Sequence, residues 1–278
     1  MLRIITDTAS DITKEQADKM NIEIVPLAIT FEDGDCPQVE EKDFVIFYER
    51  LQKCQKLPTT SRPTPEAYLK IYEEAKSKGE EVLVLTLSGG LSGTIETAFT
   101  AKQMGEYENV HIVDTHQAII AQRMIVEYAV KLRDEGYKAK DIAEKIEECR
   151  DRIVVCGVVD TLKYLKIGGR VPASLATIGE ALRIKPVIVL EDTILKTIGK
   201  ARGRKDGISK LYSKVEKDGI DTNYPVYFGY TTNKEIVDDF MYVTCKKYNL
   251  KDTKIYPVGG IIGTHCGTNC IAIAYMKK

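Results

Sequence analysis

The chain has 278 residues, more than the ~100–200 that usually form one domain, so we expect two packed domains with a large core. Lysine and arginine number 40 against 41 acidic residues, and this formal charge of −1 argues against a nucleic-acid surface or a polybasic membrane anchor. Asp7 stands where a signal peptide needs its apolar core, and the apolar runs are far shorter than the ~20 residues that span a bilayer. With seven scattered cysteines, which we interpret as reduced thiols, this pattern predicts a cytoplasmic protein without stable membrane insertion.

The first half of the sequence alternates short apolar runs with amphipathic segments. Asp43 is expected to cap a helix whose Phe44, Phe47, Tyr48 and Leu51 share one face. Residues 58–65 hold three prolines and cannot be helical. Strands alternating with helices predict a parallel sheet covered on both faces. We expect strands at 2–6, within 22–31, at 82–87, 110–113 and 153–159, and helices at 14–20, 66–78, 117–133 and 140–151.

The pattern changes beyond residue 159. Two apolar β-branched runs flank Glu191, Asp192 and Thr193, which predicts an antiparallel hairpin of 186–190 with 194–198. We therefore expect an N-terminal α/β domain over 1–155 and a C-terminal α/β domain over 156–278 with a mixed or antiparallel sheet. Further predictions are a loop at 163–172, helices at 173–182, 205–217 and 235–248, and strands at 226–230, near 254–257 and at 271–275.

The segment 87–94 reads Leu-Ser-Gly-Gly-Leu-Ser-Gly-Thr between a predicted buried strand and a predicted helix. The first backbone N–H groups of a helix have no intrahelical partner, and the helix dipole is positive at that end. This turn is therefore suited to bind an anion, with the Ser92 hydroxyl beside it. The alternative from these residues alone is that Ser92 is an ordinary N-cap and the glycines only form the turn.

The usual catalytic signatures are absent from the sequence. We find no G-x-G-x-x-G, no P-loop, no H-E-x-x-H and no G-x-S-x-G motif. His265, Cys266 and Cys270 lack a fourth ligand or a paired C-x-x-C, so we predict neither a metal site nor a nucleotide site.

We expect polar loops at 59–63, 91–94 and 263–267, and they belong to six short motifs that occur in order along the chain. The motifs are 6–11 (Thr-Asp-Thr-Ala-Ser-Asp), 59–63 (Thr-Thr-Ser-Arg-Pro), 91–94 (Leu-Ser-Gly-Thr), 165–170 (Leu-Lys-Ile-Gly-Gly-Arg), 199–203 (Gly-Lys-Ala-Arg-Gly) and 263–267 (Gly-Thr-His-Cys-Gly). They resemble the motifs of the DegV family of bacterial fatty-acid-binding proteins. This resemblance implies a two-domain protein that holds one long-chain fatty acid between its domains, in an apolar tunnel, and presents the carboxylate to a separate fatty acid kinase subunit. The fatty acid would be its ligand, with no cofactor and no enzymatic activity of its own. The resemblance spans nearly the whole chain.

The resemblance also assigns roles to individual residues. It implies that the hydroxyls of Thr60 and Ser92 hold the carboxylate and that His265 orients them. Hydroxyl and imidazole donors suit this role, because a hydrogen bond to a charged group contributes ~1.5–3 kcal/mol. The residues themselves also allow Thr60 to be a turn residue and His265 to be bonded to the backbone. The implied carboxylate site comprises Thr60, Ser61, Ser92, Gly93, Thr94 and His265.

Arg170 and Arg202 resemble family arginines that contact the kinase or the transferred phosphate, whereas their sequence context alone also suits solvated charges. One further hypothesis stays open. The chain could be a stand-alone transferase or hydrolase related to the dihydroxyacetone-kinase fold, with Asp7, Asp11 or His265 as acid–base groups.

Overall fold

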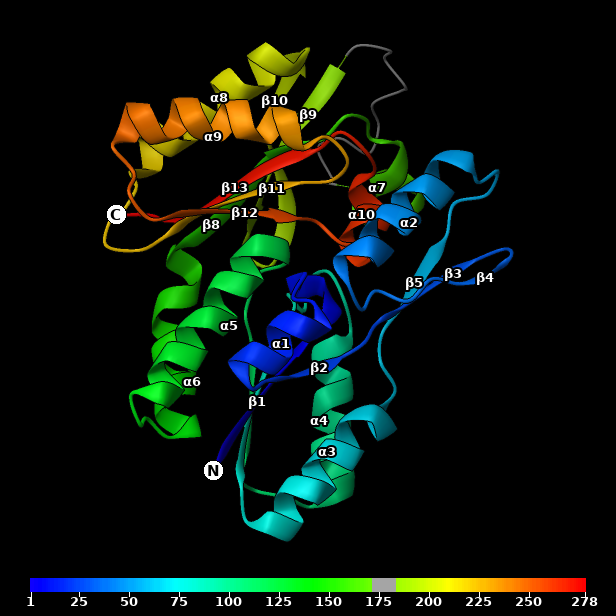
Figure 1. Ribbon diagram of the computed structural model, residues 1–278, viewed down its shortest axis with the longest axis vertical. Coiled ribbons are helices and arrows are strands. Elements are labelled where there is room, and N and C mark those ends of the chain that lie inside the picture. The colour runs from blue at the N-terminus through cyan, green and yellow to red at the C-terminus, as the bar shows by residue number, and fades with distance from the viewer. Residues whose placement is uncertain (172–183) are drawn as a thin grey trace.

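The first sheet contains four parallel strands in the order β2-β1-β6-β7. The computed structural model describes residues 1–171 and 184–278 (Figure 1). Helices α3 and α4 cover one face of this sheet and α5 and α6 cover the other, which confirms the predicted two-sided parallel sheet. Its elements are β1 (Leu2–Asp7), the 3-10 helix η1 (Thr8–Ser10), α1 (Lys14–Met20), β2 (Glu23–Val25), α3 (Pro65–Lys78), β6 (Glu81–Thr86), α4 (Thr94–Gly105), β7 (Val110–Asp114), α5 (Ile119–Asp134), α6 (Ala139–Cys149) and the 3-10 helix η2 (Arg150–Arg152).

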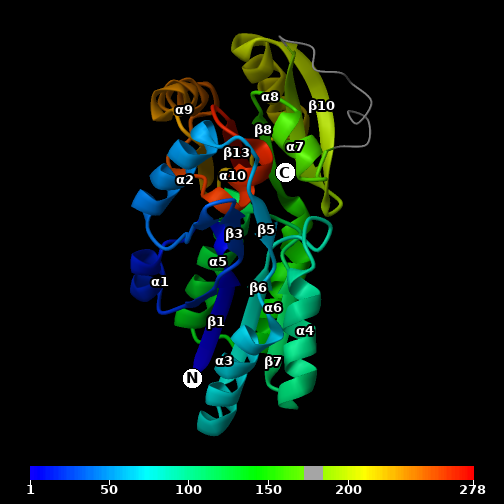
Figure 2. The same cartoon turned by 90° about the vertical axis from the view of Figure 1, so that its right-hand side faces the viewer.

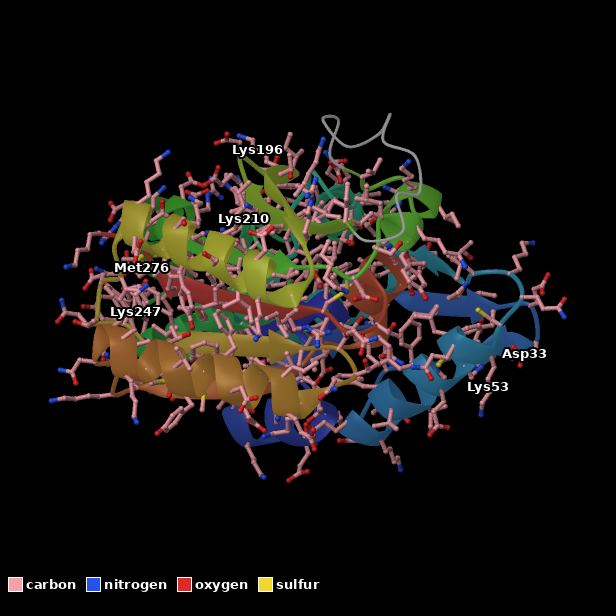
Figure 3. The ribbon with its side chains drawn as sticks, turned by 90° about the horizontal axis from the view of Figure 1, so that it is seen from above. Asp33, Lys53, Lys196, Lys210, Lys247 and Met276 are labelled. Carbon is pink, nitrogen blue, oxygen red and sulfur yellow. The ribbon has the colours of Figure 1, made fainter. Side chains whose placement is uncertain are left out.

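The second sheet has six strands in the order β10-β9-β8-β13-β11-β12. Among the described strand pairs, β11 with β12 is parallel and the others are antiparallel, so the prediction of a mixed sheet is confirmed. Helices α8 and α9 lie side by side over one face, marked by Lys210 and Lys247 in Figure 3. The elements are β8 (Ile153–Val158), β9 (Ile184–Glu191), β10 (Ile194–Arg202), α8 (Arg204–Asp218), β11 (Val226–Tyr230), α9 (Lys234–Tyr248), β12 (Thr253–Pro257) and β13 (Ile271–Met276).

The other face of the second sheet lies against the first unit, because α5 packs on β8, β11 and β13. Glu127 of α5 ties the two together. Its carboxylate accepts hydrogen bonds from Tyr227 Oη at 2.6 Å, Lys254 Nζ at 2.7 Å and Tyr256 Oη at 3.3 Å. The domain boundary expected at residue 155 stays a prediction; that position lies inside β8, which pairs with strands of the second sheet.

A small three-stranded sheet, β4 (Gly34–Asp35), β3 (Ala28–Phe31) and β5 (Thr59–Ser61), completes the molecule with α2 (Glu41–Lys53) and α10 (Gly260–Cys266) (Figure 2). Its strand β5 lies in the proline-rich segment, which is not helical before Pro65, as predicted, and Pro65 begins α3. Helix α2 buries Phe44, Phe47, Tyr48 and Leu51 on one face, also as predicted.

Four local predictions need correction or comment. Asp43 is not the N-cap of α2, because the helix begins two residues earlier; its carboxylate instead accepts hydrogen bonds from the N–H groups of Val39 and Glu40. The predicted loop at 163–172 contains a short helix, α7 (Lys163–Ile167). The histidine segment at 263–267, expected to be a loop, lies mainly in α10. The helix predicted at 173–182 lies outside the described residues.

Candidate functional site

The carboxyl ends of β1 and β6 lie next to each other, and the first polar loops of the site leave from them. In an open parallel sheet, ligands bind in the crevice outside such ends where neighbouring connections run in opposite directions. Asp7, at the end of β1, accepts hydrogen bonds from Leu87 N at 2.8 Å and Ala9 N at 3.0 Å. Burial raises the pKa of Asp7 to about 6, although the bond from Leu87 acts in the opposite direction. Asp7 therefore fixes the start of the segment 87–94, which we call the serine loop.

The serine loop places Ser92 just before helix α4. The helix begins at Thr94 with Gly93 as its N-cap, so Ser92 is not the N-cap. Its hydroxyl instead lies 2.9 Å from the hydroxyl of Thr94, which is fully buried. The Ser92 side chain is thus available at the mouth of a twelve-residue helix, where the dipole favours an anion.

Thr60 and His265 come together from segments 205 residues apart. Thr60 Oγ1 of β5 lies 3.1 Å from His265 Nε2 of α10. The other ring nitrogen, Nδ1, is buried and has no hydrogen-bond partner in the described part of the chain. Burial lowers the pKa of His265 to about 4, and the positive charge of Arg170 acts in the same direction. The imidazole is therefore neutral at physiological pH.

Helix α10 is held in place at its first turn by two side chains from the N-terminal part of the chain. Gly259 N donates to Asp11 Oδ1 at 2.9 Å, and Gly260 N donates to Gln38 Oε1 at 2.5 Å. Burial raises the pKa of Asp11 to about 8. The helix also approaches α2 closely: a Cβ atom added at Gly260 would lie 2.6 Å from Phe47 Cγ. These contacts determine where His265 lies.

An apolar cavity of about 230 Å³ extends from these polar groups between the second sheet and the loops at the carboxyl end of the first sheet. Its polar end carries Thr60, Ser61, Ser92, Gly93 and His265. Thr94 is not among the lining residues and supports Ser92 from behind. The rest of the wall is mostly aliphatic and comes from the second sheet, the loops that follow β2 and β6, α10 and the start of α5. Its apolar side chains include Leu27, Leu87, Leu91, Ala118, Ile119, Val155, Val159, Leu165, Ile188, Leu190, Leu195, Val258, Ile261, Ile262 and Ala272.

Two arginines of the cavity wall bind carbonyl groups of the serine loop. Arg170 Nε donates to Leu91 O at 3.1 Å, and Arg62 Nη1 donates to Gly93 O at 3.1 Å. Sequence reasoning missed Arg62, although it directly follows Thr60 and Ser61 and is the one cation of that motif. The structure separates the expected pair of arginines: Arg202 lies at the end of β10, exposed, and outside the cavity lining.

A surface hollow shares Leu91, Ser92, Gly93, Arg170 and Leu195 with the cavity, so the cavity meets the surface at the serine loop.

Within residues 1–171 and 184–278, no group of three or more His, Cys, Asp or Glu side chains is arranged to hold a metal ion. No helix in the same residues is long and apolar enough to cross a membrane.

Comparison with known proteins gives a consistent result over the whole chain. The family model described as "Uncharacterised protein, DegV family" matches residues 1–278. Protein DegV of Bacillus subtilis is 28% identical over 281 residues, covering 100% of this chain and 99% of the relative.

Two solved structures have the same fold. A fatty-acid-binding DegV family protein from Thermus thermophilus is 26% identical, with a TM-score of 0.87 and coverage of 99% of both chains. The Fatty Acid Kinase B3 protein of Streptococcus pneumoniae, loaded with linoleic acid, is 21% identical with a TM-score of 0.87 and covers both chains fully. At that identity the second likeness shows the shared fold alone.

Proposed function

Because this chain belongs to the DegV family, we propose that it binds one long-chain fatty acid between its two domains, with the carboxylate at Thr60, Ser92 and His265. The observation that supports this most strongly is the shape and chemistry of the cavity, which is aliphatic along its length and polar at the end that meets the surface. A fatty acid has the same division between tail and head group.

The protonation state of His265 supports a specific arrangement of donors. A neutral imidazole carries one N–H, and placing it on Nε2 lets it donate to Thr60 Oγ1. The Thr60 hydroxyl is then free to donate its own proton to a carboxylate. Ser92 supplies a second hydroxyl from the start of α4. In this arrangement His265 orients Thr60, and no group has to act as a nucleophile.

The tail supplies most of the driving force for binding. About 14 buried methylenes at ~0.8 kcal/mol each offer on the order of 10 kcal/mol before the costs of ordering the chain. Two or three hydrogen bonds to the carboxylate add ~1.5–3 kcal/mol each and fix the direction of the ligand. Binding should therefore persist in moderate salt, which screens exposed charges but not a buried tail.

We further propose that the chain is a carrier subunit that presents the carboxylate to a separate kinase. The sequence has no nucleotide-binding loop, while Arg170 stands at the mouth of the cavity, where a phosphate on the carboxylate would lie. The enzyme alternative has less support. Asp7 and Asp11 are buried, bind backbone N–H groups and do not line the cavity.

The first experiment is mass spectrometry of lipid extracted from the purified protein, with native mass spectrometry for stoichiometry. We expect roughly one long-chain fatty acid per chain. A preparation without lipid that also shows no thermal shift with added fatty acid would contradict the proposal.

The carrier role is tested separately, in a reconstituted assay with a fatty acid kinase and ATP. Arg202→Ala, outside the cavity lining, should leave fatty-acid affinity nearly unchanged and lower acyl-phosphate formation. Arg170→Ala removes a contact to the serine loop, so it should weaken binding somewhat and lower acyl-phosphate formation by a larger factor. The control is Lys53→Ala, an outward-pointing charge on α2 (Figure 3). Normal transfer by both arginine variants, or acyl-phosphate made by the wild-type chain without a partner, would favour the enzyme alternative.

A further inference from the structure

On three neighbouring strands of the second sheet, the residues that lie directly opposite one another are glycine or alanine, with little or no side chain. Gly157 of β8 pairs directly with Ala272 of β13, and Ala272 pairs directly with Gly229 of β11. All three residues line the cavity, as does Ile188 of β9, the partner of Gly157 on the other side. We call Gly157, Ala272 and Gly229 the small-residue row.

The small-residue row lies on the sheet face that meets the first unit. Side chains alternate between the faces of a strand, and the neighbours of the row on this face, Val155 and Tyr227, are buried against α5. The opposite face, with Val158 and Phe228, packs on α8 and α9. Val155 on β8 and Tyr227 on β11 are larger than the row residues, while Ala274 is the neighbour on β13, so the row forms a trough across the strands that is shallowest at β13.

We propose that the acyl chain lies in this trough, perpendicular to the strands, and that Gly229 and Val258 at its far end set the length of chain that fits. This inference rests on the proposed function and adds the determinant of specificity. The direction follows from the ends of the cavity: the mouth includes Leu195 of β10, at one edge of the sheet, whereas Gly229 lies on β11, next to the other edge. From Ile188 on β9 to Gly229 on β11 the distance across the sheet is three strand spacings of ~4.8 Å, or about 14 Å.

Close contacts define the far end. A Cβ atom added at Gly229 would lie 3.3 Å from Ile120 Cδ1 and 3.4 Å from Val258 Cγ2, which is tight but requires shifts of only a few tenths of an ångström. At Gly157 the same atom would lie 2.6 Å from the backbone oxygen of Ile271, which cannot move aside. Gly229 is therefore the position where one methyl group can be added with the least disturbance of the sheet.

Val258 permits the opposite change. Its side chain is 3% exposed and lines the cavity, while its backbone is held independently of that side chain. Val258 N donates to Tyr230 O at 2.7 Å, and Val258 O accepts from Tyr48 Oη at 2.9 Å. Val258→Ala consequently lengthens the space beyond Gly229 and keeps these bonds.

The experiment is a competition among saturated fatty acids of increasing length, with the bound fraction of each measured by mass spectrometry. Gly229→Ala should shift the preferred length down by one or two carbons, with affinity for the longest bound chain falling about fourfold per excluded methylene, the equivalent of ~0.8 kcal/mol. Val258→Ala should shift the preferred length up. The control is Gly199→Ala on β10, where an added Cβ would meet the flexible side chain of Lys210 outside the cavity.

The outcomes separate this inference from the proposed function. If the wild-type chain binds no fatty acid, the proposed function fails. If wild type binds and the length profiles of Gly229→Ala and Val258→Ala equal that of Gly199→Ala, the trough does not position the tail and this inference is overturned. Melting curves establish that each variant is folded; should Gly229→Ala not fold, the profile of Val258→Ala decides alone.

Discussion

Replacing Thr60 by valine tests the head-group site most directly, because the two side chains have nearly the same shape and differ in the hydroxyl. In the structure Thr60 Oγ1 is the partner of His265 Nε2, at 3.1 Å. Within the described residues the other imidazole nitrogen has no partner, so the variant leaves a buried ring without any hydrogen bond. The substitution removes one donor to the ligand and disturbs the group that orients it.

The expected magnitude follows from these two losses. A buried polar group left without its partner costs ~1–3 kcal/mol, so Thr60→Val should lower the free energy of unfolding of the ligand-free protein by about this amount. Losing a bond to the carboxylate should weaken fatty-acid binding by a further ~1–3 kcal/mol, or roughly 5- to 150-fold in Kd. Thr60→Ser keeps the hydroxyl and should recover most of the lost stability and most of the lost fatty-acid affinity.

Chemical denaturation measures the free energy of unfolding, and displacement of a fluorescent fatty acid measures the affinity for the ligand. Thr59→Val is the matched control, since Thr59 is the neighbouring residue of β5 and is exposed. If Thr60→Val binds fatty acid within twofold of Thr59→Val, the carboxylate does not contact Thr60 and the proposed head-group site is wrong.

Three further predictions concern Ser92, His265 and Asp11. Ser92→Ala should weaken fatty-acid binding by ~1–3 kcal/mol, and it should also lower the ligand-free melting temperature, because the buried Thr94 hydroxyl loses its bond to Ser92; affinity equal to wild type would place the head group elsewhere. NMR titration of His265 should show a neutral ring down to about pH 4. The unfolded chain takes up this proton near pH 6.5, so stability should fall as the pH decreases from about 6.5 to about 4, and His265→Gln should remove this dependence. A bound fatty-acid anion should raise the pKa of His265, because a nearby negative charge favours the imidazolium; an unchanged titration with ligand would contradict the assignment. With the pKa of Asp11 raised to about 8, the folded protein holds a proton that the unfolded chain releases near pH 3.8. Stability should therefore fall as the pH rises from about 4 to about 8, and Asp11→Asn should flatten this decline in denaturation curves measured across that range.

The sequence predicted those parts of the fold that depend on local pattern. The strand at Val226–Tyr230 and the tyrosine- and phenylalanine-bearing face of α2 follow from periodicity and burial, which neighbouring residues carry. Helix α10 was missed because its glycines disfavour a helix in isolation. Because Gly260 and Gly263 have no side chains, α10 can pack closely on Phe47, more than 200 positions away in the sequence.

In the candidate site, too, features set by neighbouring residues could be predicted, and features set by contacts distant in sequence could not. Thr60, Ser92 and His265 were identified by resemblance, and the structure brings them to one cavity. The turn from β6 into α4 that forms the serine loop could be predicted because strand, turn and helix are consecutive in sequence. Arg62 was missed, since its role depends on the carbonyl of Gly93, 31 residues away. The small-residue row could not be predicted at all, because it exists only once β8, β13 and β11 pair in register.

The contacts between the two halves of the molecule differ in strength along the cavity. At the mouth, Ser88 Oγ donates to Thr193 O at the tip of the β9–β10 hairpin, and the exposed Arg170 donates to Leu91 O. Near the far end, two residues from Gly229, Tyr227 shares the Glu127 carboxylate with Lys254 and Tyr256.

Bonds to a partly buried carboxylate are worth more than a neutral bond or an exposed one. Glu127 therefore joins the second sheet to α5 most firmly at the far end of the cavity, and the contacts beside its mouth are weaker.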